Sequence, residues 1–254
     1  MSTQSSARIG AVIGFTCGCS EAPNTGGERV TLATRVELEE KARAPFTTGL
    51  GWEVTIDEAY VSIGELRYFE GDPVTAWRWL EIESAHAHPG HYQEGGAVGE
   101  MLEPTSVDLL ASPVETALGK GVTGVASSAR FSFHAPPTGP ASSALSGSVV
   151  RVVGTATKDA LVRPFAVSAL EADVLDTEGL PQVEGCTFEN GGVDAGGTVV
   201  LEVRPSVWLD QVDFSLVAES AGGAPVELPP GEIPHKGFVR GLEKAAAYGF
   251  SFRQ

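Results

Sequence analysis

The stretch Val30-Thr-Leu-Ala-Thr-Arg-Val-Glu-Leu38 alternates core-type and polar side chains along its length. Its two strongest polar residues, Arg35 and Glu37, both fall on the same set of alternate positions. Successive side chains of a β-strand point to opposite faces, so a period of two predicts a strand with one buried face. The stretch therefore indicates a sheet with one dry and one wet face.

The same alternation recurs along the chain, and turns rich in Gly and Pro separate the repeats. The later stretches are residues 52–57, 130–134, 199–204, 211–216 and 248–253. Helical spacing of apolar residues is confined to Gly237–Ala247 and a shorter region at Ala111–Leu118. Many short strands of this kind are typical of a sandwich or a barrel. We predict an all-β fold, an antiparallel β-sandwich with one or two short helices.

Residues 28–254 are expected to form one β-sandwich, because all-β units often reach roughly 200 to 250 residues. The longest polar stretch inside this body is residues 135–148, rich in Pro, Ser and Gly. It is either a linker between two β domains or a long crossover within one sandwich. The crossover is favoured, because each half alone would leave strand edges to protect.

The balance of charge limits the partners of the chain. It has 17 Lys and Arg against 33 Asp and Glu, a net charge of −16 and a pI near 4.6. Nucleic acids and anionic lipid surfaces bind proteins through clustered basic residues, so neither is an expected partner.

The first residues have the layout of a bacterial lipoprotein signal. Arg8 precedes the apolar run Ile9–Phe15, and Gly18 stands directly before Cys19. We predict lipidation at Cys19, with residues 1–27 forming the signal and a flexible tether. The protein is then periplasmic or on the cell surface, and contacts the membrane through the lipid anchor only. Thr16 stands where such signals usually have Leu, and an N-terminal tail with incidental cysteines is the alternative.

Cysteine usage agrees with this signal without requiring it. The chain has three cysteines, Cys17, Cys19 and Cys186. If Cys19 carries the lipid, Cys186 is left without a disulfide framework. If processing falls elsewhere, Cys186 has an N-terminal cysteine available for pairing.

Three of the five histidines lie within six positions, in Ser84-Ala-His-Ala-His-Pro-Gly-His-Tyr92. In an extended segment His86 and His88 point to the same face. The Pro89-Gly90 turn allows His91 to fold back toward them. Three neutral imidazoles with an open position suit copper or zinc, because both favour nitrogen ligands. We therefore predict a metal site, with copper first and zinc second.

Other residues are candidates to complete this site. His134 ends a predicted strand and is the likelier fourth ligand of the two isolated histidines, ahead of His235. Met101 offers a thioether suited to Cu(I). Carboxylates that can orient the imidazoles are Glu81, Glu83, Glu94 and Glu100. The alternative is a solvated loop whose histidines simply titrate or join loop hydrogen bonds.

The sequence lacks the usual enzyme signatures, including G-x-S-x-G, the phosphate-binding loop, H-E-x-x-H and C-x-x-C. We expect a non-enzymatic metal-binding protein. The main alternative is a metal-independent cell-surface structural or adhesion module with a protein or glycan partner whose identity is unknown. A zinc-dependent hydrolase is the third reading, although no general base is evident.

The layout of the chain resembles the methanobactin-associated periplasmic copper-binding proteins. The features shared are the lipoprotein start, the β body, the segment Trp77-Arg-Trp79 before the histidines, and Val199-Val-Leu-Glu-Val-Arg-Pro-Ser-Val-Trp-Leu-Asp-Gln-Val-Asp-Phe214. The resemblance implies copper held by histidines and a tryptophan-derived kynurenine that a di-haem partner makes. Trp77 or Trp79 would be that tryptophan. The concentration of histidines within six positions departs from the family.

Overall fold

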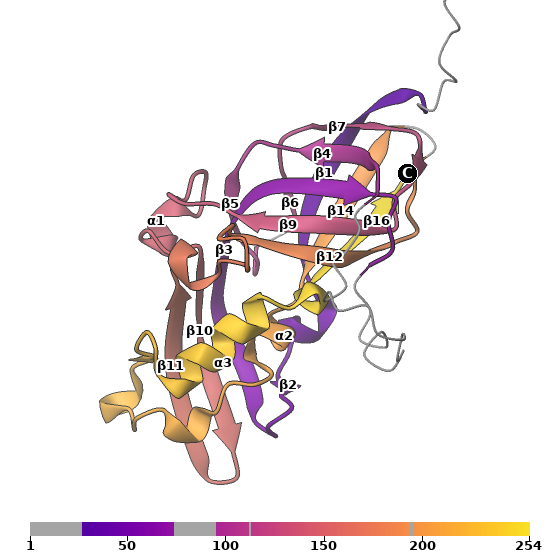
Figure 1. The fold of residues 1–254 in the computed structure, drawn as a ribbon. Helices are drawn as coiled ribbons and strands as arrows, with labels where there is room; N and C mark the ends of the chain where they lie inside the picture. Colours follow the sequence, from indigo (N-terminus) through magenta and orange to yellow (C-terminus); the bar gives the residue numbers. More distant parts are fainter. Residues whose placement is uncertain (1–26, 74–94, 112, 194–195) are drawn as a thin grey trace, which may run out of the picture.

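A closed ring of eight strands forms the centre of the structure (Figure 1). The computed structural model describes residues 27–73, 95–111, 113–193 and 196–254. The body is mostly β-strand with few short helices, as the sequence predicts. The ring consists, in spatial order, of β3 (Glu53–Phe69), β4 (Ala97–Met101), β7 (Gly119–Val122), β1 (Arg29–Leu38), β14 (Gly197–Val203), β16 (Tyr248–Arg253), β12 (Gln182–Glu189) and β9 (Ser128–Phe133).

Strand β3 closes the ring, because its second half pairs with β4 on one side and β9 on the other. Tyr68 lies opposite both Gly99 and Ala129. The expected sandwich of two stacked sheets is therefore corrected to a closed barrel. The pairing is not purely antiparallel either, since β1 runs parallel to β14 and β12 runs parallel to β16.

Irregular pairing along β3 accompanies the closure. The register shifts between Ile63 and Leu66 against β9, and between Tyr68 and Phe69 against β4. Such bulges bend a strand and increase its twist, which allows a sheet to curl onto itself. Alternation alone does not reveal these positions, so the sequence pattern could not separate a barrel from a sandwich.

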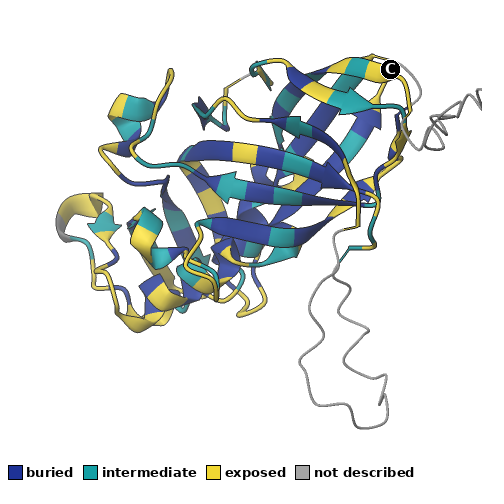
Figure 2. Cartoon of the chain, turned by 45° about the horizontal axis from the view of Figure 1, so that its top comes forward, coloured by how far each residue is buried: buried dark blue, intermediate teal, exposed yellow. Residues whose placement is uncertain are grey.

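The inside of the barrel is filled by apolar and aromatic side chains. Tyr248 stacks on Phe131 with ring centroids 4.0 Å apart, and Tyr68 packs edge-on against Phe188 at 5.5 Å. Figure 2 shows buried residues alternating with more exposed ones along the barrel strands. The alternation that began with residues 30–38 thus places one face of each strand in the core.

Two glycines allow the strands around Leu32 to pack closely. A Cβ atom added to Gly121 would lie 2.8 Å from Leu32 Cδ1, and one added to Gly99 would lie 2.9 Å from Tyr68 Cδ2. The large side chains of Leu32 and Tyr68 therefore occupy the space that side chains at Gly99 and Gly121 would need.

A hairpin and helices extend from the end of the barrel at which β1 finishes (Figure 1). The first half of β3 pairs with β10, and β10 pairs with β11. Glu39, directly after β1, accepts hydrogen bonds from Ser206 N and Ser206 Oγ at 2.7 and 2.9 Å. This end contains β10 (Val150–Lys158), β11 (Leu161–Ala169), β2 (Phe46–Thr47), β15 (Val226–Glu227), α2 (Pro205–Leu209) and α3 (Ile233–Leu242).

Two local predictions are wrong. The region Ala111–Leu118 contains the short strand β6 (Val114–Glu115), which pairs with β1 instead of forming a helix. Residues 211–216 contain a 3-10 turn, Phe214–Leu216, instead of a strand. Asp213 Oδ1 accepts a hydrogen bond from Ser215 N at 3.0 Å, and such local bonds favour turns over strands. The predicted C-terminal strand is present as β16, and the predicted helix near Gly237 as α3.

The stretch 135–148 contains the short helix α1 (Ser142–Leu145). Barrel strands lie on both sides of it in the sequence, with β1, β3, β4, β7 and β9 before it and β12, β14 and β16 after it. The remaining strands are β5 (Thr105–Asp108), which pairs with β3, and β8 (Gly124–Val125), which pairs with β13 (Gly192–Val193).

Helices long and apolar enough to span a membrane are not found in the described part of the chain.

Candidate functional site

One end of the barrel, here called the loop rim, gathers the start of β1 and the end of β3. The rim is traced by register: Arg29 lies opposite Val122, and Ala97 lies opposite Phe69. β4 and β7 connect these pairs, since Gly99 lies opposite Gly121. The chain therefore enters the barrel from residues 1–28 at the same end at which it leaves β3 toward residue 74.

The segment that contains His86, His88 and His91 is an insertion in the β3–β4 hairpin. The backbone N–H of Glu70 donates to the carbonyl of Gly96 at 3.0 Å, just beyond the Phe69–Ala97 pair. Gly95 has φ of +70°, a conformation that favours glycine, and a Cβ there would lie 3.0 Å from Gly71 N. The two ends of the histidine segment are thus held side by side at the loop rim.

Several predicted residues lie outside the described residues. These are the candidate ligands His86, His88 and His91, the carboxylates Glu81, Glu83 and Glu94, the tryptophans Trp77 and Trp79, and the predicted lipidation site Cys19. Their predictions are neither confirmed nor contradicted.

His134, the predicted fourth ligand, lies away from the loop rim. Phe133 pairs with Ile63, whereas Ser128, at the other end of β9, pairs with Phe69. At about 3.3 Å per residue, His134 is roughly 20 Å along the strand from the hairpin stem. Ser62 Oγ donates a hydrogen bond to the backbone carbonyl of His134 at 2.7 Å, so this contact is made by the backbone and not by the imidazole.

His235 is a core residue with only 2% of its surface exposed. Its Nε2 lies 3.0 Å from the carbonyl of Ser168, and its Nδ1 accepts a hydrogen bond from Gly231 N at 3.4 Å. A carbonyl requires a donor, so Nε2 carries the hydrogen in this arrangement. The side chain ties α3 to β11, which is a structural role.

Met101 and Glu100 lie on opposite faces of β4. Met101 is fully buried inside the barrel opposite Leu66, so its thioether is directed to the core. Glu100 lies opposite Lys120 and Arg67 on the outer face and is half-buried. Of these two, only Glu100 is on a surface that a ligand can reach.

Cys186 is a free, buried thiol in the core. Burial raises its pKa to about 12, because the thiolate would have to form away from water. The Sγ atom lies 3.5 Å from the carbonyl of Val183. Pairing with an N-terminal cysteine, one alternative from the sequence, would require this part of the barrel to open.

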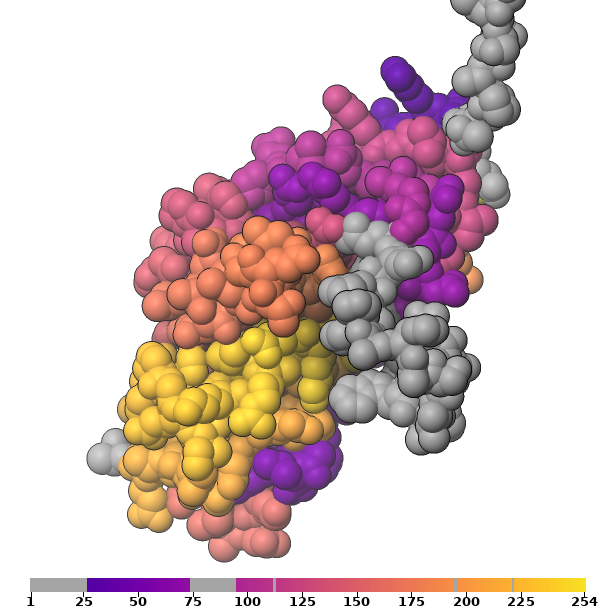
Figure 3. Space-filling view, in the orientation of Figure 1, coloured from indigo at the N-terminus to yellow at the C-terminus, as the bar shows by residue number. Residues whose placement is uncertain are grey.

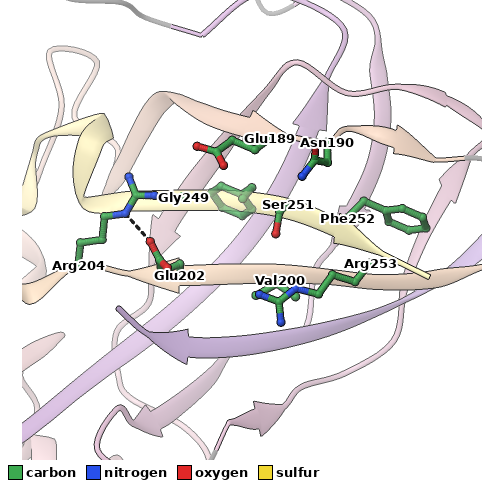
Figure 4. Close-up of a pocket in the computed structure, with 10 residues that line it drawn as sticks. Glu189, Asn190, Val200, Glu202, Arg204, Gly249, Ser251, Phe252 and Arg253 are labelled. Atoms are coloured by element: carbon green, nitrogen blue, oxygen red, sulfur yellow. Dashed lines mark hydrogen bonds and ion pairs between the residues drawn. The ribbon is translucent and has the colours of Figure 1, made fainter. Parts of the chain in front are cut away.

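A second polar feature lies on the outside of β12, β14 and β16 (Figure 4). It is a pocket of about 260 Å³. The guanidinium of Arg204 pairs with Glu202 at 2.6 Å and lies over Gly249, where it occupies the space that a Cβ would need. Arg253 reaches across to Glu37 at 3.1 Å. Both arginines already have carboxylate partners, so the pocket is a paired charge network.

A larger groove, of about 550 Å³, crosses β4, β7 and β1 at the loop rim. Sequence reasoning missed it, because Arg29, Lys120 and Glu100 are far apart in the chain and only the strand order brings them together. No group of three or more His, Cys, Asp or Glu side chains suited to a metal occurs in the residues that the structure describes.

In comparisons with known protein families, curated proteins and solved structures, the chain matches none of them.

Proposed function

We propose that the protein binds copper, or zinc, through His86, His88 and His91 at the loop rim of an exported, lipid-anchored β protein. The observation that supports this most directly is the hairpin stem, in which Glu70 N donates to Gly96 O at 3.0 Å. The stem holds both ends of the histidine segment on neighbouring strands. The three imidazoles therefore belong to one insertion, residues 74–94, whose two flanks are paired with each other.

The stem also lowers the entropic cost of assembling a metal site. Closing a flexible segment costs free energy that grows with the logarithm of its length. In this protein the barrel has already joined the ends, so metal binding does not have to bring them together. Carboxylates that can orient imidazoles are abundant in and beside the segment, as the sequence shows for Glu81, Glu83 and Glu94.

His134 is the weakest member of the predicted ligand set. Its strand places it roughly 20 Å from the stem. The proposed site therefore centres on three imidazoles with an open position, a set that both copper and zinc accept. The kynurenine chemistry implied by the family resemblance would involve Trp77 or Trp79 and stays a prediction.

The test is metal titration of the full-length chain and two variants. The wild type is expected to bind one copper or zinc ion per chain, and the triple variant His86→Ala/His88→Ala/His91→Ala is expected to lose this binding. His134→Ala is the matched control and should retain it. Thermal unfolding of all three proteins is measured alongside, so that a loss of metal binding is distinguished from a loss of the fold.

The outcomes separate the competing functions. If the triple variant binds metal with unchanged stoichiometry and affinity, the proposed site is wrong. If the wild type binds no metal above background, a metal-independent surface module is favoured instead. Turnover of ester or phosphoester substrates by the zinc-loaded wild type, lost in the triple variant, would favour a hydrolase.

A further inference from the structure

The groove across β4, β7 and β1 carries two cations, Arg29 and Lys120, on its surface. Arg29 and Lys120 are both exposed, and neither forms an ion pair with any residue that the structure describes. Most other described arginines are paired, including Arg35 with Glu115 at 2.6 Å and Arg67 with Glu65 at 2.8 Å. Arg29 and Arg240 are the two arginines without an ion pair among the described residues, and Arg29 lies beside Lys120 in a chain of net charge −16.

Strand register places the two cations on one face. Lys120 lies directly opposite Thr31, and Arg29 lies opposite Val122. Directly opposed residues share a face, and so do residues two apart, so Arg29, Thr31 and Lys120 all point the same way. That face is the outer one, because a Cβ on the neighbouring Gly121 would meet the buried side chain of Leu32. Arg29 and Lys120 are diagonal neighbours, with Cα atoms about 7–8 Å apart, so both can contact one anion.

Glu100 adds a negative charge on the other side of Lys120. It lies directly opposite Lys120 on β4 and is half-buried, and no ion pair joins the two among the described residues. Arg67 lies on the other side of Glu100, on β3, and is already paired with Glu65 at 2.8 Å. From Glu100 on β4 to Arg29 on β1 the charges run negative, positive, positive over three strands spaced about 4.8 Å apart. This order fits a zwitterion whose anionic group contacts Lys120 and Arg29 and whose cationic group contacts Glu100.

The position of the groove indicates where such a zwitterion comes from. Residues 1–27, the predicted anchor and tether, join the barrel at Glu28, whose N donates to Thr123 Oγ1 at 2.8 Å and whose carbonyl accepts from Thr123 N at 2.8 Å. This junction is one residue from Arg29. A lipid attached to the predicted tether would connect to the barrel at this rim. The overall negative charge of the chain disfavours binding to an anionic lipid surface, so the expected ligand is the headgroup of a zwitterionic phospholipid.

We infer that the groove formed by Arg29, Lys120 and Glu100 binds the phosphoethanolamine headgroup of a zwitterionic phospholipid. The phosphate is held by Arg29 and Lys120, and the ammonium is held by Glu100. Bound in this way, the barrel turns its loop rim toward the membrane and its α2–α3 end away from it. Figure 3 shows indigo and magenta atoms, from the first part of the described chain, at the upper end of the molecule and yellow atoms, from its last part, nearer the lower end. The inference adds a second membrane contact to the lipid anchor that the sequence predicts as the only one. It rests on that predicted anchor for its orientation and does not depend on metal binding.

The test uses the full chain with Cys19→Ser, which removes the lipid, in metal-free buffer. Binding of glycerophosphoethanolamine and of inorganic phosphate is measured by NMR titration, and binding to phosphatidylethanolamine-containing vesicles by co-sedimentation. Arg29→Gln/Lys120→Gln should weaken headgroup and vesicle binding by at least about tenfold, because charge-assisted hydrogen bonds are lost. Lys236→Gln/Lys244→Gln is the matched control, with the same change of charge at α3, and should bind as the parent does.

A third variant tests the zwitterion itself. Glu100→Gln should weaken binding of glycerophosphoethanolamine while leaving inorganic phosphate binding unchanged or stronger, because it removes only the contact to the ammonium. Equal loss in the groove and control variants would overturn the inference, since it would indicate bulk charge alone. Inorganic phosphate bound as tightly as the headgroup, with no vesicle binding, would also overturn it and would assign the groove to soluble phosphate esters. None of these results depends on the histidines, so a failure here leaves the metal proposal intact.

Discussion

The backbone N–H of Glu70 donates to the carbonyl of Gly96 across the stem of the β3–β4 hairpin, at 3.0 Å. This bond continues the pairing of Phe69 with Ala97 and fixes both ends of the histidine segment to adjacent barrel strands. The chain therefore leaves and re-enters the folded body at the loop rim on either side of the segment. The barrel supplies the support, and the residues of the segment supply the proposed chemistry.

Closure of the barrel around Leu32 depends on the absence of a side chain at Gly121. In Gly121→Ala the new Cβ would lie 2.8 Å from Leu32 Cδ1 and 2.9 Å from the carbonyl of Val98. We expect a loss of about 1–3 kcal/mol in the free energy of unfolding, measured by urea denaturation. Gly192→Ala is the control, because nothing lies within 4 Å of its added Cβ. Equal stability of the two variants would show that the packing at Leu32 tolerates a side chain.

The sequence predicted the β class well because alternation is a local signal. Residues 30–38 form β1 with alternate residues buried, and residues 248–253 form β16. Closure depends on β3 pairing with both β4 and β9, and on bulges at Ile63 and Tyr68. These are long-range relationships without a local sequence signature, so the sandwich was the wrong choice between two similar classes.

The candidate site was predictable only in part, for the same reason. Clustered histidines are visible in the sequence, whereas the hairpin stem that holds their ends is not. The groove of Arg29, Lys120 and Glu100 is formed by strand order alone. The sequence correctly places His134 at the end of a strand. The register of β9 against β3 shows that this is the end far from the loop rim, which alternation along the strand does not reveal.

Glu39 links the end of β1 to α2. It is 8% exposed, and its carboxylate accepts hydrogen bonds from both Ser206 N and Ser206 Oγ. Glu39→Ala would leave these two groups without their partner, and we expect a loss of about 1–3 kcal/mol in thermal or urea unfolding. Glu40→Ala is the matched control, because the side chain of Glu40 is 95% exposed. If both variants unfold alike, the Glu39 contacts add nothing to stability.

The thiol of Cys186 should be unreactive in the folded protein. Burial raises its pKa to about 12, so at pH 8 the thiolate fraction is on the order of one in ten thousand. In a Cys17→Ser/Cys19→Ser background, iodoacetamide labelling followed by mass spectrometry should be slow in native buffer and fast in denaturant. Rapid labelling of the native protein would mean that the barrel opens near β12.

The carboxylate of Asp176 is expected to stabilise the fold at neutral pH and to lose this effect in acid. Burial acts to raise the pKa of its carboxyl, but hydrogen bonds from Leu180, Gln182, Glu178 and Gly179 outweigh burial and lower the pKa below its ordinary value of 3.8. A carboxyl with a lowered folded pKa stabilises the fold above its unfolded pKa, and this contribution is lost as the pH falls through the folded pKa.

Asp176→Asn should therefore be less stable than the wild type at pH 7, and the difference should shrink as the pH falls below about 4. Thermal unfolding between pH 2 and pH 7 measures this. A difference that stays constant over that range would assign the effect to geometry and not to the charge of Asp176.

The most direct test of the metal site is X-ray absorption at the metal edge of the full-length chain loaded with one equivalent of copper or zinc. The scattering pattern of imidazole identifies histidine ligands and their number. We predict three imidazole nitrogens, absent in His86→Ala/His88→Ala/His91→Ala and unchanged in His134→Ala. A first shell of oxygen atoms alone, or a spectrum that the triple substitution leaves unchanged, would contradict the proposed site.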